Sequence, residues 1–246
     1  MLRVHNLRKT FGSVVALDHV SISFPSRGCF AVIGPNGSGK TTLLNVLTGF
    51  VRADAGRCTY RNINLNRLLP HKIARKGIAR TFQEVRLVRH VSCLDNLLLA
   101  RRAELGKTVF RAIFSFTAEN ERAGKFEAST LLHSVGLGEK ASELAGELSY
   151  GEQKLLSLLC VQIARPEVAL FDEPFSGLHP MMIAIVEEQL KKLSDGGCLV
   201  GFIEHDMGAV SRLADHVIVM SNGKVLAEGA TGPTLSRSDV LEAYIG

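Results

Sequence analysis

The stretch GPNGSGKTT at residues 34–42 predicts the fold around it. It satisfies the pattern G-x-x-x-x-G-K-[ST] of a phosphate-binding loop, which requires a strand before it and a helix after it. The run CFAVIG at 29–34 is apolar enough to be a strand buried on both faces. The segment KTTLLNVLTGF at 40–50 repeats apolar residues at helical spacing and has a glycine near its end. This order of strand, loop and helix therefore predicts an α/β fold.

The residue types in the loop fit the binding of a nucleotide's phosphates. Glycines let successive backbone N–H groups point at phosphate oxygens, and the N-terminus of the following helix adds partial positive charge. We expect Lys40 to bridge the terminal phosphates and the Thr41 hydroxyl to bind Mg²⁺. The alternative, a glycine-rich turn that matches by accident, does not explain the flanking elements. We therefore expect the whole loop to contact nucleotide: Gly34, Pro35, Asn36, Gly37, Ser38, Gly39, Lys40, Thr41 and Thr42.

An acidic pair follows a second buried run. The segment VALF at 168–171 reads as a strand, and Asp172 and Glu173 come directly after it. We expect Asp172, at the carboxyl end of this strand, to hold Mg²⁺ through water, and Glu173 to polarise the attacking water as a general base. The alternative is an acidic helix cap in front of PFSGL. The presence of a phosphate-binding loop favours the first interpretation, in which Asp172 holds Mg²⁺ and Glu173 acts as the base.

The composition limits the classes of protein to which the chain can belong. The 246 residues are 46% hydrophobic, and 29 Lys and Arg against 24 Asp and Glu give a net charge of +5. That charge suits phosphate ligands, an acidic partner or nucleic acid, and it equally fits an ordinary solvated surface. The longest strongly apolar run, LLSLLCVQIA at 155–164, is shorter than the roughly 18 residues of a membrane span. The first residues lack the apolar centre of a secretion signal, so we expect a cytosolic chain whose five cysteines are reduced thiols in the core.

The sequence pattern changes in the middle of the chain. From about residue 84 to residue 160, SCLDNLLLARRAEL and NERAGKFEASTLLHSVGL look helical and no clear strand appears. This predicts a helical subdomain inserted into an α/β core. After it, we expect the strand VALFDEP, the amphipathic helix MMIAIVEEQLKKL, the strand CLVGFIEH and a final hairpin around SNGK.

The stretch LSYGEQ at 148–153 places a serine and a glycine at the start of a predicted helix, which is the local chemistry of a second anion site. Taken alone, it is a simple helix N-cap with Ser149. Taken with the phosphate-binding loop and the strand ending at Asp172, it resembles the signature motif of the ATP-binding subunits of ABC transporters. In that family two nucleotide-binding domains pair head to tail, and the signature serine of one copy closes over the γ-phosphate bound by the other. The resemblance implies that Ser149, Gly151 and Glu152 contact the partner's ATP, and that ATP holds the dimer together.

The resemblance also assigns roles to three single residues. Gln83, in RTFQEVRL, matches the Q-loop glutamine that touches Mg²⁺ and the attacking water. His205, in FIEHDM, resembles the switch histidine that contacts the γ-phosphate, and Phe11, in KTFGS, falls where the family has an aromatic stacked on adenine. Taken alone, Gln83 would be a solvated loop amide, His205 a structural histidine and Phe11 a packing residue of an edge strand.

The resemblance covers essentially the whole chain. It implies one ABC ATP-binding domain at 1–246: a P-loop NTPase core with a RecA-like sheet and an N-terminal antiparallel β-subdomain from 1–83 and 161–246, and a helical subdomain at 84–160. The segments LLNVLTGF, RTFQEVRL, NLLLA, IEHDM and VLEAYIG look like the ATPase subunits of branched-chain amino-acid importers. The implied function is ATP hydrolysis that drives uptake of branched-chain or hydrophobic amino acids through separate membrane subunits.

Other functions stay open at this point. Urea and short-amide importers have similar ATPases, and exporters use the same kind of ATPase domain. A soluble mechanical ATPase that acts on nucleic acid or ribosomes is the alternative from another class. Such proteins usually fuse two of these domains or insert a long coiled coil, and this sequence has neither feature.

The resemblance implies a set of partners and a location. The partners are an identical or related ATPase subunit in a dimer, transmembrane permease subunits docked in a groove between residues 84 and 103, and a solute-binding protein reached through the complex. No nucleic acid is expected. The implied location is peripheral, at the cytoplasmic face of the inner membrane.

The sequence departs from the family pattern in three places. His179, in SGLHP, stands where this branch has Asn and the wider family Asp, in a loop that connects the two active sites. Tyr150 and Glu152 replace the Gly and Gln of the signature. Ser157 and Cys160 replace charged residues on the following helix. The His179 difference concerns coupling between the two active sites. The Ser157 and Cys160 differences concern the packing of that helix and not ATP binding.

Overall fold

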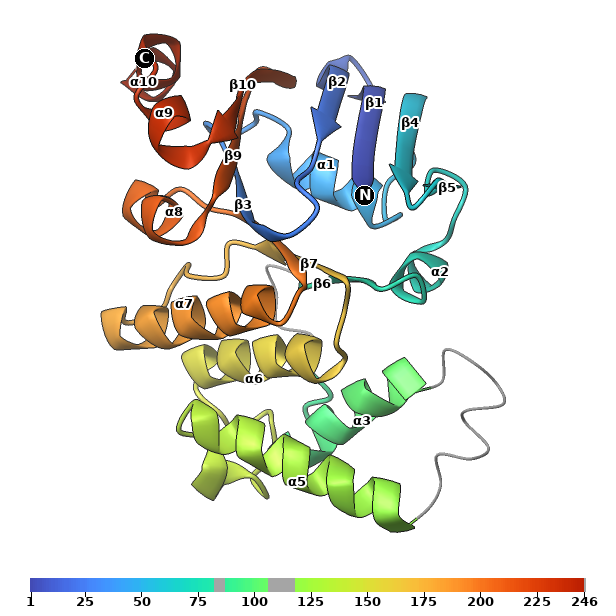
Figure 1. Ribbon diagram of the computed structural model, residues 1–246, viewed down its shortest axis with the longest axis vertical. Helices are drawn as coiled ribbons and strands as arrows, with labels where there is room; N and C mark the ends of the chain where they lie inside the picture. Colours follow the sequence, from blue (N-terminus) through green and yellow to red (C-terminus); the bar gives the residue numbers. More distant parts are fainter. Residues whose placement is uncertain (82–86, 106–117, 246) are drawn as a thin grey trace. The chain divides into compact units, whose positions relative to one another are not determined.

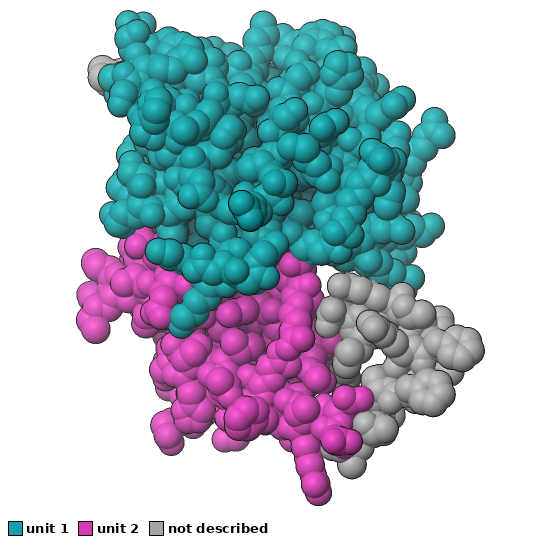
Figure 2. Space-filling model, in the orientation of Figure 1, with its two compact units in different colours: residues 1–80, 167–174, 190–246 teal, residues 81–166, 175–189 magenta. Residues whose placement is uncertain are grey.

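The computed structural model describes residues 1–81, 87–105 and 118–245. The chain forms two compact units, coloured teal and magenta in Figure 2. Unit 1 consists of residues 1–80, 167–174 and 190–246, and unit 2 of residues 81–166 and 175–189.

Unit 1 contains a four-stranded antiparallel sheet with the strand order β2-β1-β4-β5. Leu2 and Val4 on β1 are buried and alternate with exposed residues, as in a sheet with one buried face. A register shift between Val4 and Leu7 brings Leu7 back to the buried side. This sheet is the antiparallel β-subdomain predicted for the N-terminal part. Its strands are β1 (Leu2–Phe11), β2 (Val14–Ser23), β4 (Ala55–Tyr60) and β5 (Ile63–Asn64).

The second sheet of unit 1 has six strands in the order β10-β9-β3-β8-β7-β6. Pairing is parallel from β9 through to β6, and only β10 is antiparallel, so that β9 and β10 form the hairpin predicted around residues 221–224. Asn222 and Gly223 in its turn both have positive φ, as a two-residue hairpin requires. The strands are β3 (Gly28–Ile33), β6 (Ile78–Arg80), β7 (Val168–Asp172), β8 (Leu199–Ile203), β9 (His216–Ser221) and β10 (Lys224–Ala230).

The central strands of this sheet position the residues of the candidate site. Every residue of β7 and β8 is buried, and so are five of the six residues of β3, because they lie inside the sheet and are covered on both faces. Parallel strands end at the same edge of a sheet, and in open α/β sheets ligands bind at that edge. The loop at 34–42 follows β3, Asp172 ends β7 with Glu173 next to it, and His205 comes shortly after β8, so these residues gather at one edge. Figure 1 shows β3 and β7 in the core of unit 1.

The helices of unit 1 pack around these sheets. Helix α1 (Lys40–Leu47) begins in the phosphate-binding loop, and its residues Leu43, Leu44 and Leu47 are buried in the core. The amphipathic helix α7 (Pro180–Asp195) lies partly in each unit. The remaining helices of unit 1 are α2 (Pro70–Ala74), α8 (Met207–Leu213), α9 (Thr231–Leu235) and α10 (Ser238–Ile245).

Unit 2 is helical, as predicted for the inserted subdomain. In the described part of residues 81–166, the one β pairing is an isolated bridge between Ser92 and Leu144. Helix α3 packs against both α5 and α6. The elements are α3 (Cys93–Leu105), α5 (Ala118–Ser134), the 3₁₀ turn η1 (Gly138–Lys140) and α6 (Tyr150–Ile163).

Two further observations concern the chain as a whole. Within the described ranges, no helix is both long enough and apolar enough to span a bilayer. The five cysteines are free thiols, and burial raises the pKa of Cys58 and Cys198 to about 12. These two thiols are therefore protonated and unreactive at neutral pH.

Candidate nucleotide-binding site

Unit 1 has a cavity of about 300 Å³ at the start of α1. One wall is the phosphate-binding loop, and Glu173 and His205 from the ends of β7 and β8 face it. The structure thus brings together residues that lie far apart in the sequence. The lining residues are Val14, Ala16, Asn36, Gly37, Gly39, Lys40, Thr41, Thr42, Glu173 and His205.

The loop can take its shape only with glycine at particular positions. Gly34 and Gly39 have φ of 145° and 101°, and a Cβ added there would lie 2.0 Å from the Met220 carbonyl oxygen and 2.3 Å from the Ala16 carbonyl oxygen. Gly37 has φ of 78°, but a Cβ there would have no atom of the described chain within 4 Å. The backbone is therefore packed closely against its surroundings at two points and is open to the cavity at the third.

Lys40 is hydrogen-bonded to the backbone of the loop. Its side chain is buried, and the ammonium Nζ donates hydrogen bonds to the carbonyl oxygens of Gly34 at 2.8 Å and Pro35 at 2.9 Å. Burial lowers its pKa, and the carboxylates of Glu173 and Asp172 act in the opposite direction. An ammonium has three N–H donors, so Lys40 keeps one beyond these two bonds for a phosphate oxygen.

Ser38 supplies a test of whether the loop suits an anionic ligand. Its hydroxyl oxygen is buried and has no hydrogen-bond partner among the described residues. Buried hydroxyls are nearly always hydrogen-bonded, so an orphaned one marks a place for a ligand or water. The hydroxyl lies inside the loop, 2.9 Å from where a Cβ on Gly34 would be. A phosphate-binding loop accounts for this arrangement.

Asp172 is held by a partner that the sequence analysis did not identify. The carboxylate Oδ2 lies 2.8 Å from Nη2 of Arg80, and both side chains are 4% exposed. Arg80 also donates through Nη1 to Asn45 Oδ1 at 2.7 Å and to Thr48 Oγ1 at 3.2 Å, at the far end of α1. One guanidinium therefore joins the ends of β6 and β7 to the helix that starts in the phosphate-binding loop. The only sequence signal was an arginine three residues before Gln83.

Glu173 and His205 lie within hydrogen-bond distance, with Oε1 of Glu173 3.3 Å from Nε2 of His205. Glu173 has a φ of 50°, the left-handed region that a non-glycine residue rarely adopts, and its backbone N–H donates to the Ile203 carbonyl oxygen. Strained backbone of this kind is concentrated at functional sites. The pair can hold a water molecule beside the loop and accept its proton.

The donor set fits Mg²⁺. Among the described residues there is no cluster of three or more His, Cys, Asp or Glu side chains that would enclose a metal ion. Mg²⁺ is usually bound by one or two protein oxygens together with phosphates and waters, and the Thr41 hydroxyl and the Asp172 carboxylate are hard oxygen donors of this type. Gln83, the third predicted ligand, lies outside the described residues.

In unit 2, the start of α6 is a capping box. The backbone N–H of Glu152 donates to Ser149 Oγ at 3.4 Å, and Oε2 of Glu152 accepts from the N–H of Ser149 at 2.9 Å and from its hydroxyl at 2.8 Å. The other carboxylate oxygen, Oε1, lies 2.8 Å from Nζ of Lys140. Lys140 lowers the pKa of Glu152, and Glu152 raises the pKa of Lys140. Lys140, which offsets the charge of the Glu152 carboxylate, was not predicted from the sequence.

The same helix contacts the loop that carries His179. A Cβ on Gly151 would lie 2.5 Å from Met182 Sδ, so glycine allows close packing at this position. Nζ of Lys154 donates to the Ser176 carbonyl oxygen at 2.6 Å and lies 5.3 Å from the centre of the Tyr150 ring. Helix α6 and the 175–179 loop are therefore joined inside unit 2.

The remaining predicted residues are placed as follows. Phe11 is exposed at the end of β1, paired with Val14, which lines the cavity, and Nζ of Lys9 lies 5.2 Å from its ring centre. Ser149, Gly151 and Glu152 belong to unit 2, whereas the cavity is formed by residues of unit 1.

Comparison with known proteins gives consistent results. A family model described as ABC transporter matches residues 17–176. The chain is 36% identical to the high-affinity branched-chain amino acid transport ATP-binding protein BraF of Pseudomonas aeruginosa, over 100% of this chain and 98% of the relative. It is 35% identical to LivG of Escherichia coli K12, described in the same words, with the same coverage. The crystal structure of the ADP conformation of an ATP-binding cassette of an ABC transporter aligns with a TM-score of 0.83 and 34% identity, covering 100% of this chain and 98% of that one.

Proposed function

We propose that this chain drives uptake of branched-chain or other hydrophobic amino acids through separate membrane subunits. The premise is that the chain belongs to the ABC transporter family, as one of its ATP-binding and ATP-hydrolysing subunits. The amino-acid substrate is supported by the names of the relatives that match the full length of the chain. The observation that carries the catalytic part is the cavity in which the phosphate-binding loop faces Glu173 and His205.

In this proposal the loop binds the phosphates of ATP. Backbone N–H groups between Gly34 and Thr42 and the Lys40 ammonium would donate to phosphate oxygens, and Ser38 would gain the hydrogen-bond partner it lacks among the described residues. The Thr41 hydroxyl, Asp172 and Gln83 would hold Mg²⁺. When bound, the ion supplies positive charge that offsets charge developing on the terminal phosphates.

Glu173 and His205 would carry the chemical step. Glu173 accepts a proton from the attacking water, and His205, 3.3 Å away, orients the carboxylate and contacts the γ-phosphate. Phosphoryl transfer requires little covalent work from the protein, so most of the rate acceleration comes from placement of charge around the phosphate.

A second copy of the chain, or a related subunit, would complete each site. Ser149, Gly151 and Glu152 of that copy would close over the γ-phosphate, because the N-terminus of a helix such as α6 favours an anion. Phe11 would stack on the adenine. The whole chain at 1–246 would act as one ABC ATP-binding domain, with residues 84–160 as its helical subdomain.

The proposed location is peripheral, at the cytoplasmic face of the inner membrane. Permease subunits would dock in the groove between residues 84 and 103, of which residues 84–86 lie outside the described residues. A solute-binding protein would belong to the same complex. Co-purification of this chain with two membrane subunits and a solute-binding protein would support import, and co-purification with an exporter's membrane domains would contradict it.

The experiment that tests the catalytic assignment is Glu173→Gln. The amide keeps the shape of the side chain but cannot accept the proton, so ATP turnover should fall at least about a hundredfold while binding of a fluorescent ATP analogue stays intact. Glu228→Gln, at an exposed position on β10, is the matched control and should hydrolyse ATP normally. Near-native turnover by Glu173→Gln would show that the general base is another group.

A further inference from the structure

One segment of unit 1 holds the chain's excess of positive charge. Residues 55–80 contain seven of the 29 Lys and Arg residues and none of the 24 Asp and Glu residues. The rest of the chain has 22 basic against 24 acidic side chains. The net charge of +5 therefore comes from this segment alone, which forms β4, β5, α2 and β6.

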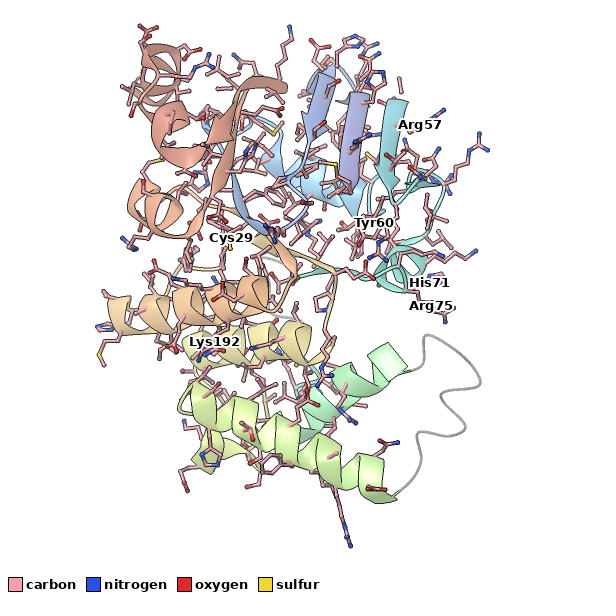
Figure 3. The ribbon with its side chains drawn as sticks, in the orientation of Figure 1. Cys29, Arg57, Tyr60, His71, Arg75 and Lys192 are labelled. Atoms are coloured by element: carbon pink, nitrogen blue, oxygen red, sulfur yellow. The ribbon has the colours of Figure 1, made fainter. Side chains whose placement is uncertain are left out.

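Most of these cations are on the surface. Arg80 is buried in its ion pair with Asp172, and Arg61 pairs with Glu167 at 2.9 Å. The other five are exposed, and with His71 we call them the cationic surface: Arg57, Arg67, Lys72, Arg75 and Lys76. Figure 3 shows Arg57 on β4, and His71 and Arg75 at α2, projecting from the same side of unit 1.

The charges of the cationic surface are not neutralised within the described parts of the chain. None of its five Lys and Arg side chains has an ion pair or hydrogen bond there. Exposed cations elsewhere often do, for example Lys125 with Glu121, Lys224 with Asp18 and Arg237 with Asp239. The cationic surface therefore presents positive charge that the described chain does not offset.

An apolar side chain lies in the same segment. Leu69 precedes Pro70 at the start of α2 and is 48% exposed. Ile73 on the other side of this short helix is buried, which fixes the helix on unit 1. Long cationic side chains beside an exposed leucine are typical of surfaces that meet the boundary of a lipid bilayer.

We propose that the cationic surface binds the anionic headgroups of the membrane beside the transport complex. The inference rests on the proposed function for the nearness of a membrane. A headgroup layer is fluid, so it needs no cations fixed in one geometry. Within the described ranges, the five side chains have no hydrogen bonds that would fix them. Single-stranded nucleic acid would need exposed aromatic rings for stacking, and the aromatic residue of this segment, Tyr60, is buried.

The test is sedimentation of the purified chain with lipid vesicles. The wild type should bind vesicles of phosphatidylcholine with phosphatidylglycerol and should not bind phosphatidylcholine alone. Lys72→Gln/Arg75→Gln/Lys76→Gln should weaken binding roughly a hundredfold, since each cation near an anionic surface contributes about fivefold. Raising the salt to about 1 M should abolish binding, because it shortens the screening length to about 3 Å.

A matched variant separates this surface from charge in general. Arg122→Gln/Lys125→Gln/Lys224→Gln removes the same number of charges from exposed positions elsewhere and should bind nearly as the wild type does. Leu69→Ser should weaken binding to anionic vesicles severalfold while leaving the charge unchanged. The fold of each variant is checked by circular dichroism.

Three outcomes would overturn the proposal: equal loss in the matched variant, equal binding to neutral vesicles, or a charge effect that appears only when the permease subunits are present. The last result would assign the cationic surface to an acidic protein face. Lys72→Gln/Arg75→Gln/Lys76→Gln should keep normal ATP binding and hydrolysis, because none of these residues lines the cavity. Failure of this inference is therefore distinguishable from failure of the proposed function.

Discussion

Arg80 illustrates how much the site depends on single buried contacts. Removing an ion pair from water costs more than its attraction returns unless the remaining donors and acceptors are also satisfied. The pair between Arg80 and Asp172 meets that condition in part through the bonds from Arg80 to Asn45 and Thr48. Its contribution is a fixed orientation for the carboxylate before any metal binds.

We predict that Arg80→Met lowers the free energy of unfolding by about 3–5 kcal/mol, because it leaves a buried carboxylate without a partner. Arg80→Lys should lose less, since it keeps the charge but cannot reach Asp172, Asn45 and Thr48 together. Urea unfolding without nucleotide measures both. Arg57→Met, at an exposed position, is the control and should change stability by no more than about 0.5 kcal/mol. A loss at Arg80→Met equal to that of the control would mean that the pair does not order the site.

The glycines of the loop allow a paired prediction. Gly37→Ala should cost about 1–2 kcal/mol through its positive φ alone, because its surroundings are open. Gly39→Ala should cost about 1–3 kcal/mol more, since its Cβ would overlap the Ala16 carbonyl oxygen at 2.3 Å. Thermal unfolding in the absence of nucleotide measures the difference. Equal losses would indicate that the loop moves away from β2 at little cost.

The residues of the site differ in how well the sequence predicts them. Lys40, Thr41, Gly37 and Gly39 belong to one continuous motif, so spacing alone was enough to predict that they lie together, and all four line the cavity. Arg80 and Lys140 act through partners 92 and 12 residues away, and no local pattern shows such pairs. The left-handed backbone of Glu173 also follows from tertiary packing and was not predicted.

At the scale of elements, the prediction succeeded where burial leaves a strong pattern. Strands β3, β7 and β8 are continuous apolar runs because both faces of the sheet are covered. Strand β5, which has two residues, was not predicted, because pairing with a neighbouring strand defines it more than composition does. Helices α2 and α9, with five residues each, are likewise too short to show a helical period.

The N-terminal cap of helix α6 affects the contact proposed between this helix and the ATP of a partner copy. The carboxylate of Glu152 closes the capping box, but its negative charge would repel the γ-phosphate of a partner's ATP. Lys140, 2.8 Å away, offsets that charge. The departure from the family's Gln is therefore matched by a cation on the preceding turn.

We predict that Lys140→Ala weakens the ATP-dependent dimer severalfold, because it leaves Glu152 uncompensated beside the phosphate. The same change made together with Glu152→Gln should have almost no effect. Sedimentation equilibrium with the hydrolysis-deficient Glu173→Gln chain measures both, since turnover does not then disturb the dimer. An equal loss in both backgrounds would mean that Lys140 acts on something other than the charge of Glu152.

In the molecule as a whole, the phosphate-binding loop and the start of α6 lie in different compact units. The phosphate-binding loop, Glu173 and His205 belong to unit 1, and the capping box of α6 belongs to unit 2. Under the proposed function each site takes its second set of donors from another copy. ATP then acts as the link between copies, and its hydrolysis removes the link.

We therefore predict that Glu173→Gln elutes from a sizing column as a dimer in the presence of MgATP and as a monomer without nucleotide. Under the proposed function, ATP binds most tightly to the dimer, in which each site is complete. The dimer fraction should therefore rise with nucleotide concentration. Ser149→Ala in the same background should shift the transition to higher ATP, because it removes the hydroxyl proposed to contact the γ-phosphate. Thr130→Ala removes a hydroxyl from the exposed part of α5 and is the matched control. A chain that stays monomeric at millimolar MgATP, although it binds the nucleotide, would rule out the completed site on which the proposed mechanism depends.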